Sequence, residues 1–170
     1  MTEKYVIGVD IGGTNLVVGV IPAEGGEPVA LRSAATRGQR GPAAVVSDVG
    51  TMANAVISET LQRTGASQEQ VVGIGIGCPG SIDLKAGVVL TAPNLGWSNY
   101  PMRDHISEQL GLPATLDNDA NCATYGEWWQ GAGRGAGVLS GVTLGTGTVS
   151  YTHLRAHETD SYLVCRLLLE

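Results

Sequence analysis

A short glycine-rich segment near the N-terminus has the composition of a phosphate-binding loop. It reads Asp10-Ile11-Gly12-Gly13-Thr14-Asn15 and lies between two apolar, β-branched runs. Two adjacent glycines allow a tight turn that brings backbone N–H groups within bonding distance of an oxyanion. The carboxylate of Asp10 can hold Mg²⁺, usually through water, because this ion keeps much of its hydration shell. An ordinary Gly-Gly hairpin turn accounts for the same residues equally well.

A second segment of this kind is Leu144-Gly145-Thr146-Gly147, where a predicted strand ends in small residues and a hydroxyl. Backbone donors at such a strand end can face an anion. Taken alone, the segment is explained more simply as a glycine-rich strand end. Neither segment matches the Walker pattern or a G-x-G-x-x-G sequence followed by a helix, so the sequence argues against P-loop and Rossmann domains.

The third candidate is Asp119, a carboxylate at the start of a predicted helix, preceded by Asp117 and Asn118. The positive end of the helix dipole favours its ionised form. A fixed, ionised carboxylate can accept the proton of a hydroxyl that attacks phosphorus. Asn118 offers a donor and an acceptor, which suits recognition of a neighbouring hydroxyl. Asp and Asn are also favoured N-caps, and on spacing alone capping is the simpler explanation.

The elements that must position these residues alternate between strands and helices, which argues for an α/β or mixed-sheet domain. Turn chemistry also predicts a small hairpin around residues 85–87. Apolar and β-branched runs predict strands over residues 4–9, 16–21, 28–33, 71–77, 114–116 and 138–144. Helical spacing of apolar residues and terminal signals predict helices over residues 41–64, 102–110 and 120–130.

Length and composition narrow the class of protein. A chain of 170 residues allows one full domain and argues against two large ones. The net charge of −6 lacks the electrostatic footprint of a protein that binds nucleic acid or an anionic membrane. No apolar run is long enough to span a bilayer and no secretory signal is visible, so we expect a soluble cytoplasmic protein. The three cysteines, Cys78, Cys122 and Cys165, are odd in number and widely spaced, which predicts reduced thiols.

Five motifs stand in a fixed order along the chain: Asp10–Asn15, Gly75–Gly80, Ala92–Trp97, Asn118–Asn121 and Leu144–Gly147. Together they make residues 4–147 resemble the N-terminal half of the bacterial glucokinases of the ROK family (repressors, open reading frames and kinases). The resemblance implies the actin-like, ribonuclease-H-like ATPase fold, of which this chain would carry the N-terminal domain, a mixed sheet flanked by helices, without the second lobe. It also implies ATP-dependent transfer of phosphate to the 6-hydroxyl of a hexose, with glucose first and mannose, fructose and N-acetylated hexosamines open.

The resemblance also assigns roles to individual residues. Asp119 is the implied catalytic base, and Gly80, Asn94 and Asn118 contribute with it to the hexose site. The implied cofactors are ATP and Mg²⁺, with polyphosphate open as an alternative donor, and the full-length protein is expected to form a homodimer. The residues assigned to the phosphates are Asp10, Gly12, Gly13 and Thr14 in the first loop, with Asp10 toward Mg²⁺, and Gly145, Thr146 and Gly147 at the start of the second.

The composition changes at residue 147. All 25 glycines lie between Gly8 and Gly147, and the glycines that should continue the second phosphate loop are replaced by Thr148-Val149-Ser150. The His/Cys cluster that binds structural zinc in the family, the adenosine pocket and a closing C-terminal helix do not follow. Residues 163–170 can be back-translated into a string that resembles the end of a sequencing-library adapter. We therefore predict an N-terminal lobe over residues 1–147 and a non-native tail over residues 148–170, against the alternative of a natural C-terminal strand or helix.

Three functions follow from this sequence. The parent gene is expected to encode a glucokinase-like hexose kinase. A sugar-responsive regulator is the alternative, although the family's repressors place a helix-turn-helix before the first phosphate loop, where this chain has nine residues. The chain as it stands is expected to be a non-catalytic fragment that can bind sugar or nucleotide, because it lacks the second wall of the ATP cleft.

Overall fold

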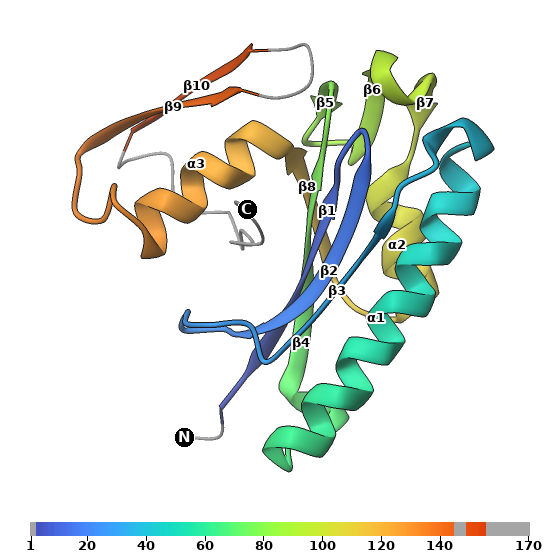
Figure 1. Cartoon of the computed structure of the whole chain (residues 1–170), viewed down its shortest axis with the longest axis vertical. Coiled ribbons are helices and arrows are strands. Elements are labelled where there is room, and N and C mark those ends of the chain that lie inside the picture. The colour runs from blue at the N-terminus through green and yellow to red at the C-terminus, as the bar shows by residue number, and fades with distance from the viewer. Residues whose placement is uncertain (1–2, 145–148, 156–170) are drawn as a thin grey trace.

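The computed structural model describes residues 3–144 and 149–155. Its centre is a five-stranded mixed sheet in the order β3-β2-β1-β4-β8 (Figure 1). The pairs β3-β2 and β2-β1 are antiparallel, whereas β4 and β8 continue the sheet in parallel with β1. These strands are β1 (Tyr5–Ile11), β2 (Asn15–Pro22), β3 (Ala30–Ala35), β4 (Val71–Cys78) and β8 (Ala114–Asn118).

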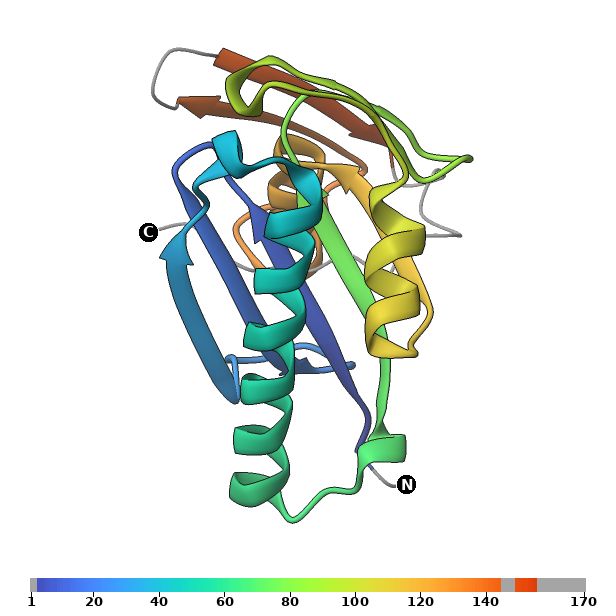
Figure 2. The same cartoon turned by 90° about the vertical axis from the view of Figure 1, so that its right-hand side faces the viewer.

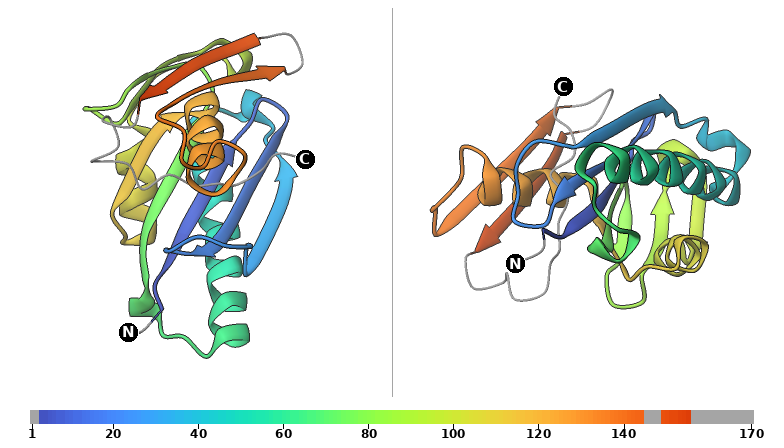
Figure 3. Two further views of the ribbon diagram at one scale, coloured as in Figure 1. Left: turned by 90° about the vertical axis from the view of Figure 1, so that its left-hand side faces the viewer. Right: turned by 90° about the horizontal axis from the view of Figure 1, so that it is seen from below.

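Helices cover both faces of this sheet. The long helix α1 (Pro42–Thr64) and the shorter α2 (Met102–Leu110) lie on one face (Figure 2). The helix α3 (Asp119–Gln130) lies on the opposite face, against β4 and β8 (Figure 3, left). The predicted mixed sheet flanked by helices is thereby confirmed.

A smaller sheet lies beyond the carboxyl ends of β1 and β4 (Figure 1). It contains the hairpin predicted around residues 85–87, which joins its first two strands. A separate antiparallel pair follows α3. The small sheet comprises β5 (Ser81–Asp83), β6 (Val88–Ala92) and β7 (Trp97–Tyr100). The separate pair comprises β9 (Val138–Leu144) and β10 (Val149–Arg155). The described residues also form the 3₁₀ turns η1 (Gly38–Arg40), η2 (Gln68–Gln70) and η3 (Pro93–Leu95).

The core forms where α1 packs on the sheet. Val45 and Val49 are completely buried on the helix face that the apolar spacing predicted. The helix begins at Pro42, whose missing N–H costs nothing in the first turn. It ends at Gly65, which adopts φ 72° and donates its N–H to the Leu61 carbonyl at 2.9 Å. The sheet strands next to it therefore have one face fixed by a rigid helix.

Several boundaries differ by one or two residues from the sequence predictions, and two of these differences have an identifiable cause. The third strand lies at 30–35 rather than 28–33, because residues 15–20 of β2 pair with it and place Ala35 opposite Asn15. Apart from Ala30 its side chains are exposed, so hydrophobic patterning carried no signal there. The third helix begins at Asp119, one residue earlier than predicted, since Asn118 already caps it.

After Leu144 a natural strand was only the alternative to a non-native tail, and β10 pairs there with β9 from Val149 to Arg155. Pairing of these strands does not test whether the segment is native, so the boundary at residue 147 stays a prediction. Within residues 3–144 and 149–155, no helix has the length and apolar character needed to cross a membrane.

Candidate functional site

Two carboxylate residues lie in one row at the carboxyl ends of the parallel strands. Asp10 of β1 pairs with Gly77 of β4, and Gly77 pairs with Asp117 of β8. Residues paired in register point to the same face of a sheet. A β-carbon on Gly77 would lie 3.4 Å from the Cys122 sulfur of α3, so this row is on the α3 face.

The start of α3 lies directly over Gly77. A β-carbon at Gly77 would lie 3.6 Å from the α-carbon of Asp119, which is an ordinary contact distance. Because Gly77 has no side chain, the first turn of the helix approaches the strand closely and Asp119 comes near Asp10. The structure therefore brings together two residues that are 109 positions apart in the sequence.

Asn118 holds the helix start in place. Its Oδ1 accepts hydrogen bonds from the backbone N–H groups of Ala120 at 2.9 Å and Asn121 at 3.4 Å. It is therefore the N-cap, and Asp119 is the first helical residue rather than the cap itself. Asp119 Oδ1 also accepts from the Ala120 N–H at 2.9 Å. The simpler explanation by capping therefore applies mainly to Asn118.

The carboxyl group of Asp10 and the thiol of Cys78 are buried and lie close to the Asp119 charge. Burial, with a smaller contribution from the Asp119 charge, raises the pKa of Asp10 from 3.8 to about 7. Burial and the charges of Asp119 and Asp10 also raise the pKa of the Cys78 thiol well above its usual range. Cys78 therefore stays a neutral thiol at physiological pH, and the ionisable chemistry of the site belongs to the two carboxyl groups.

Asp117 has a structural position in the same row. Its Oδ1 accepts from the side-chain amide of Asn121 at 2.9 Å and from the backbone N–H of Asn118 at 2.6 Å. Burial raises the pKa of Asp117, while these two hydrogen bonds lower it. Its contacts fix the turn from β8 into α3, and through that turn they fix Asp119.

The glycine loop between β1 and β2 is a tight hairpin turn, in which the Gly12 N–H donates to the Asn15 carbonyl at 2.8 Å. Residues 13–15 are exposed. A β-carbon on Gly13 would lie 3.9 Å from the β-carbon of Asn94, so the loop adjoins the turn η3. The loop therefore has the geometry of a hairpin turn. This geometry is also compatible with phosphate binding, because residues 13–15 are exposed.

Gly80 and Asn118, both assigned to the hexose site by resemblance, are hydrogen-bonded to each other. Asn118 Nδ2 donates to the Gly80 carbonyl at 3.0 Å. Gly80 adopts φ 100°, and a β-carbon there would overlap the Thr91 carbonyl oxygen. Only glycine fits this position, where the chain turns from β4 toward the small sheet. Gly145, Thr146 and Gly147 lie outside the described residues.

A divalent cation can be held here only with help from a ligand. In the part of the chain that the structure describes, no three His, Cys, Asp or Glu residues gather into a metal site. Mg²⁺ is usually bound by one or two carboxylates together with phosphate oxygens and water. Asp10, beside Asp119 and the glycine loop, fits this incomplete donor set, whereas no described group fits structural zinc.

Two structural contributors were not assigned roles from the sequence. Gly77 allows Asp119 to approach, and a glycine inside a strongly apolar strand is the signal that could have identified it. Thr36 is completely buried, and its hydroxyl donates to the Gly12 carbonyl at 2.7 Å. Nothing in its local sequence indicates this contact, because the two residues meet only through the pairing of β2 with β3.

Comparison with known proteins matches residues 6–149 to the ROK family. A glucokinase from Halalkalibacterium halodurans is 35% identical over 147 residues, which are 86% of this chain and 43% of that protein. The chain therefore spans less than half the length of this relative.

Solved structures give the same assignment. A ROK family glucokinase from Streptomyces griseus, in complex with glucose and AMPPNP, has a TM-score of 0.64 and 31% identity, covering 86% of this chain and 46% of that one. An inorganic polyphosphate/ATP-glucomannokinase from Arthrobacter has a TM-score of 0.73 and 29% identity, covering 89% and 58%. These matches confirm the expected actin-like ATPase fold. With a family match over most of its length and the same fold as these kinases, the chain belongs to the ROK family.

Proposed function

We propose that this chain is the first lobe of an ATP-dependent hexose kinase that converts glucose to glucose 6-phosphate. One observation carries the proposal: Asp119, at the start of α3, lies beside Asp10 at the end of the strand that leads into the exposed glycine loop. A base and a phosphate-binding turn are the two parts that phosphoryl transfer to a hydroxyl requires first.

Asp119 is the proposed general base. Its Oδ1 is occupied by the Ala120 N–H, which fixes the carboxylate and leaves Oδ2 to meet a substrate hydroxyl. A carboxylate held in this way can accept the proton of an attacking hydroxyl. Proton transfer from the hexose 6-hydroxyl to Asp119 makes the oxygen a better nucleophile toward the γ-phosphorus.

The glycine loop and Asp10 are the proposed phosphate side of the site. The exposed backbone of residues 13 and 14 can offer N–H groups to phosphate oxygens. Asp10 would hold Mg²⁺ together with those oxygens, and the ion would neutralise charge on the transferred group. Gly145, Thr146 and Gly147 are proposed to extend this side. Because ATP is an intracellular metabolite, we place the reaction in the cytoplasm.

The hexose side is proposed to consist of Gly80, Asn94 and Asn118. Asn94 is exposed on η3 next to Gly13, which places it between the glycine loop and the small sheet. Glucose and ATP are the proposed substrates because the relatives found include glucokinases and a structure with glucose and AMPPNP. The Arthrobacter enzyme's name includes polyphosphate, so this donor belongs in the assay.

The test is hexose-dependent consumption of ATP or polyphosphate by the full-length parent protein with a panel of hexoses. Asp119→Asn should lower kcat by roughly a hundredfold or more with hexose affinity nearly unchanged, because the base acts only in the transition state. Asp104→Asn, an exposed carboxylate on α2, is the matched control and should keep normal turnover. Near-normal turnover of Asp119→Asn would remove Asp119 as the base. Absence of turnover with every hexose and both donors would reject the kinase.

A further inference from the structure

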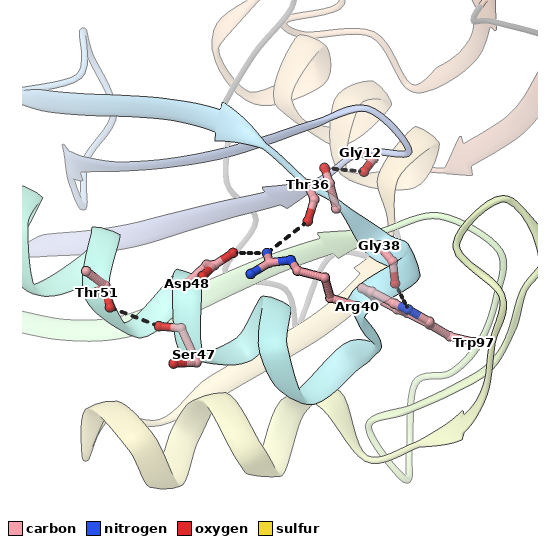
Figure 4. Close-up of polar contacts among 8 residues, drawn as sticks. All are labelled: Gly12, Thr36, Gly38, Arg40, Ser47, Asp48, Thr51 and Trp97. Carbon is pink, nitrogen blue, oxygen red and sulfur yellow. Dashed lines mark hydrogen bonds and ion pairs between the residues drawn. The ribbon is translucent and has the colours of Figure 1, made fainter.

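The segment between β3 and α1, residues 36–41, touches the glycine loop at one end. Thr36 Oγ1 donates to the Gly12 carbonyl at 2.7 Å (Figure 4). The Thr36 N–H donates to the Thr14 carbonyl at 2.8 Å. Thr36 itself is completely buried. Two hydrogen bonds thus hold two carbonyl groups of the loop, while residues 13–15 remain exposed.

The same segment contacts the turn next to the proposed hexose side. The indole Nε1 of Trp97 donates to the Gly38 carbonyl at 2.9 Å, and the Trp97 side chain is 4% exposed. Figure 4 shows the indole directed at this carbonyl. A β-carbon on Gly38 would overlap the Leu95 side chain, so η3 packs directly on the segment. Leu95 and Trp97 flank Gly96 and closely follow Asn94 in the chain.

Residues 36–41 are also fixed against the rest of the fold. Arg40 forms an ion pair with Asp48 of α1 and approaches the Thr36 carbonyl at 3.5 Å. Arg37 adopts the left-handed conformation with φ 48°, which residues other than glycine hold only when the surroundings impose it. Because the segment is held at several points, a movement of the glycine loop at one end should also move the residues that contact η3.

We propose that residues 36–41, the bridging segment, couple the glycine loop to the hexose side. The positioning residues are Thr36, the first residue of the segment, and Trp97, which contacts the segment at Gly38. The inference rests on the proposed kinase function. In-line transfer needs the donor phosphorus and acceptor oxygen aligned closely, and small misplacements are costly. The bridging segment connects the glycine loop, on the proposed side of the phosphoryl donor, to η3, on the proposed side of the hexose acceptor. Binding of one substrate therefore favours the geometry that binds the other.

Two substitutions remove one hydrogen bond each. Thr36→Val keeps nearly the same side-chain shape, whereas Trp97→Phe also makes the side chain smaller, as Trp128→Phe does in its control. Thr36→Val removes the hydroxyl that reaches Gly12, and Thr36→Ser restores it. Trp97→Phe removes the indole N–H and keeps an aromatic ring. The chain offers matched controls: the Thr60 hydroxyl, also completely buried, donates to the Val56 carbonyl at 2.8 Å within α1. Trp128 Nε1 donates to the Ala136 carbonyl at 2.9 Å near the end of α3.

The deciding measurement is the ratio of glucose dissociation constants without and with AMPPNP in the full-length protein. Thr36→Val and Trp97→Phe should each reduce the coupling by roughly fivefold or more, and Thr36→Ser should restore it. The cross-effect is the specific readout: Trp97→Phe should weaken AMPPNP binding, and Thr36→Val should weaken glucose binding. Thr60→Val and Trp128→Phe should keep the wild-type ratio even where they lower Tm. An unchanged ratio in both test variants would overturn the proposal.

Hydrogen exchange on the 170-residue chain separates this proposal from the kinase function. The Gly12 N–H is hydrogen-bonded within the glycine loop, so its exchange reports the opening of that loop. Trp97→Phe should accelerate this exchange several-fold, although Trp97 is 85 positions away in the sequence, whereas Trp128→Phe should not. If the full-length protein binds no hexose, the kinase fails and exchange alone decides the coupling. If exchange at Gly12 is the same in Trp97→Phe and wild type, the bridging segment does not couple Trp97 to the glycine loop. This conclusion holds whether or not the full-length protein is a kinase.

Discussion

Asp10 of β1 lies directly opposite Gly77 of β4, in the parallel part of the central sheet. Because Gly77 has no side chain, the first turn of α3 can pack closely against β4. This close packing places Asp119 beside Asp10. The distance between the proposed base and the proposed metal-binding carboxylate is thus governed by a residue that has no functional group.

The first prediction concerns the size of residue 77. Gly77→Ala should be tolerated, since its β-carbon would meet Cys122 at 3.4 Å and the Asp119 α-carbon at 3.6 Å. Gly77→Val adds two methyl groups toward the same atoms and should lower the free energy of unfolding by about 2 kcal/mol through overpacking. Urea unfolding of the chain and kcat of the full-length protein measure the two effects. Equal stability of the two variants would show that α3 does not rest on this strand.

The second prediction is a pH dependence that belongs to Asp10. Burial and the Asp119 charge raise the pKa of Asp10 from 3.8 to about 7 in the folded chain. Between about pH 4 and pH 7 the unfolded chain has already lost this proton while the folded chain keeps it, so stability falls as the pH rises. By pH 7.5 the loss should be about 4 kcal/mol.

Asp10→Asn should remove this dependence and be more stable than the wild type at pH 7.5. Urea unfolding at pH 4.5 and pH 7.5 measures the difference for both proteins. Asp104→Asn, exposed on α2, controls for the loss of one negative charge. A variant that is less stable than the wild type at pH 7.5, with the wild-type dependence intact, would contradict the assignment.

The third prediction separates backbone conformation from steric overlap at Gly80. Gly80 and Gly111 both have positive φ, 100° and 65°, but a β-carbon on Gly80 would overlap the Thr91 carbonyl whereas Gly111 has open space. Gly111→Ala should cost about 1 kcal/mol of unfolding free energy, from conformation alone. Gly80→Ala should cost at least about 2 kcal/mol because the small sheet must also shift. Equal costs in thermal unfolding would mean that the small sheet adapts freely.

The fourth prediction is that the 170-residue chain alone shows no hexose-dependent ATP consumption. It covers 46% of the S. griseus glucokinase that binds glucose and AMPPNP, and alignment of two substrates needs both walls of a cleft. A coupled ATP assay with glucose, run beside the full-length protein, makes the comparison. Turnover by the chain that Asp119→Asn abolishes would refute this prediction.

Much of this fold was accessible from the sequence because its signals are local. The apolar stripe of α1, the glycine that ends it and the β-branched residues of β1 depend on neighbours a few positions away, and each was located to within about two residues. The edge strand β3 was predicted two residues too early. Its position is set by hydrogen bonds to β2, and these leave no periodic pattern in its own residues.

The candidate site also has parts that the sequence predicts and parts that it does not. Asp10, Asn118 and Asp119 were predicted as site residues because each occurs in a short motif with chemical meaning. The contacts that position them were not, since Thr36 meets Gly12 and Trp97 meets Gly38 only after the sheets have formed. Long-range contacts of this kind are properties of the topology, and a single sequence gives no measure of them.

The side-chain amide of Asn118 has one further consequence, which concerns the polarity of what can bind beside it. Its oxygen accepts two backbone N–H groups, and one of its two amide hydrogens is given to Gly80. A single N–H remains for a ligand. A hydroxyl that binds there must offer a lone pair and send its own hydrogen elsewhere, so the direction of the hydrogen bond at this position is decided before any ligand arrives.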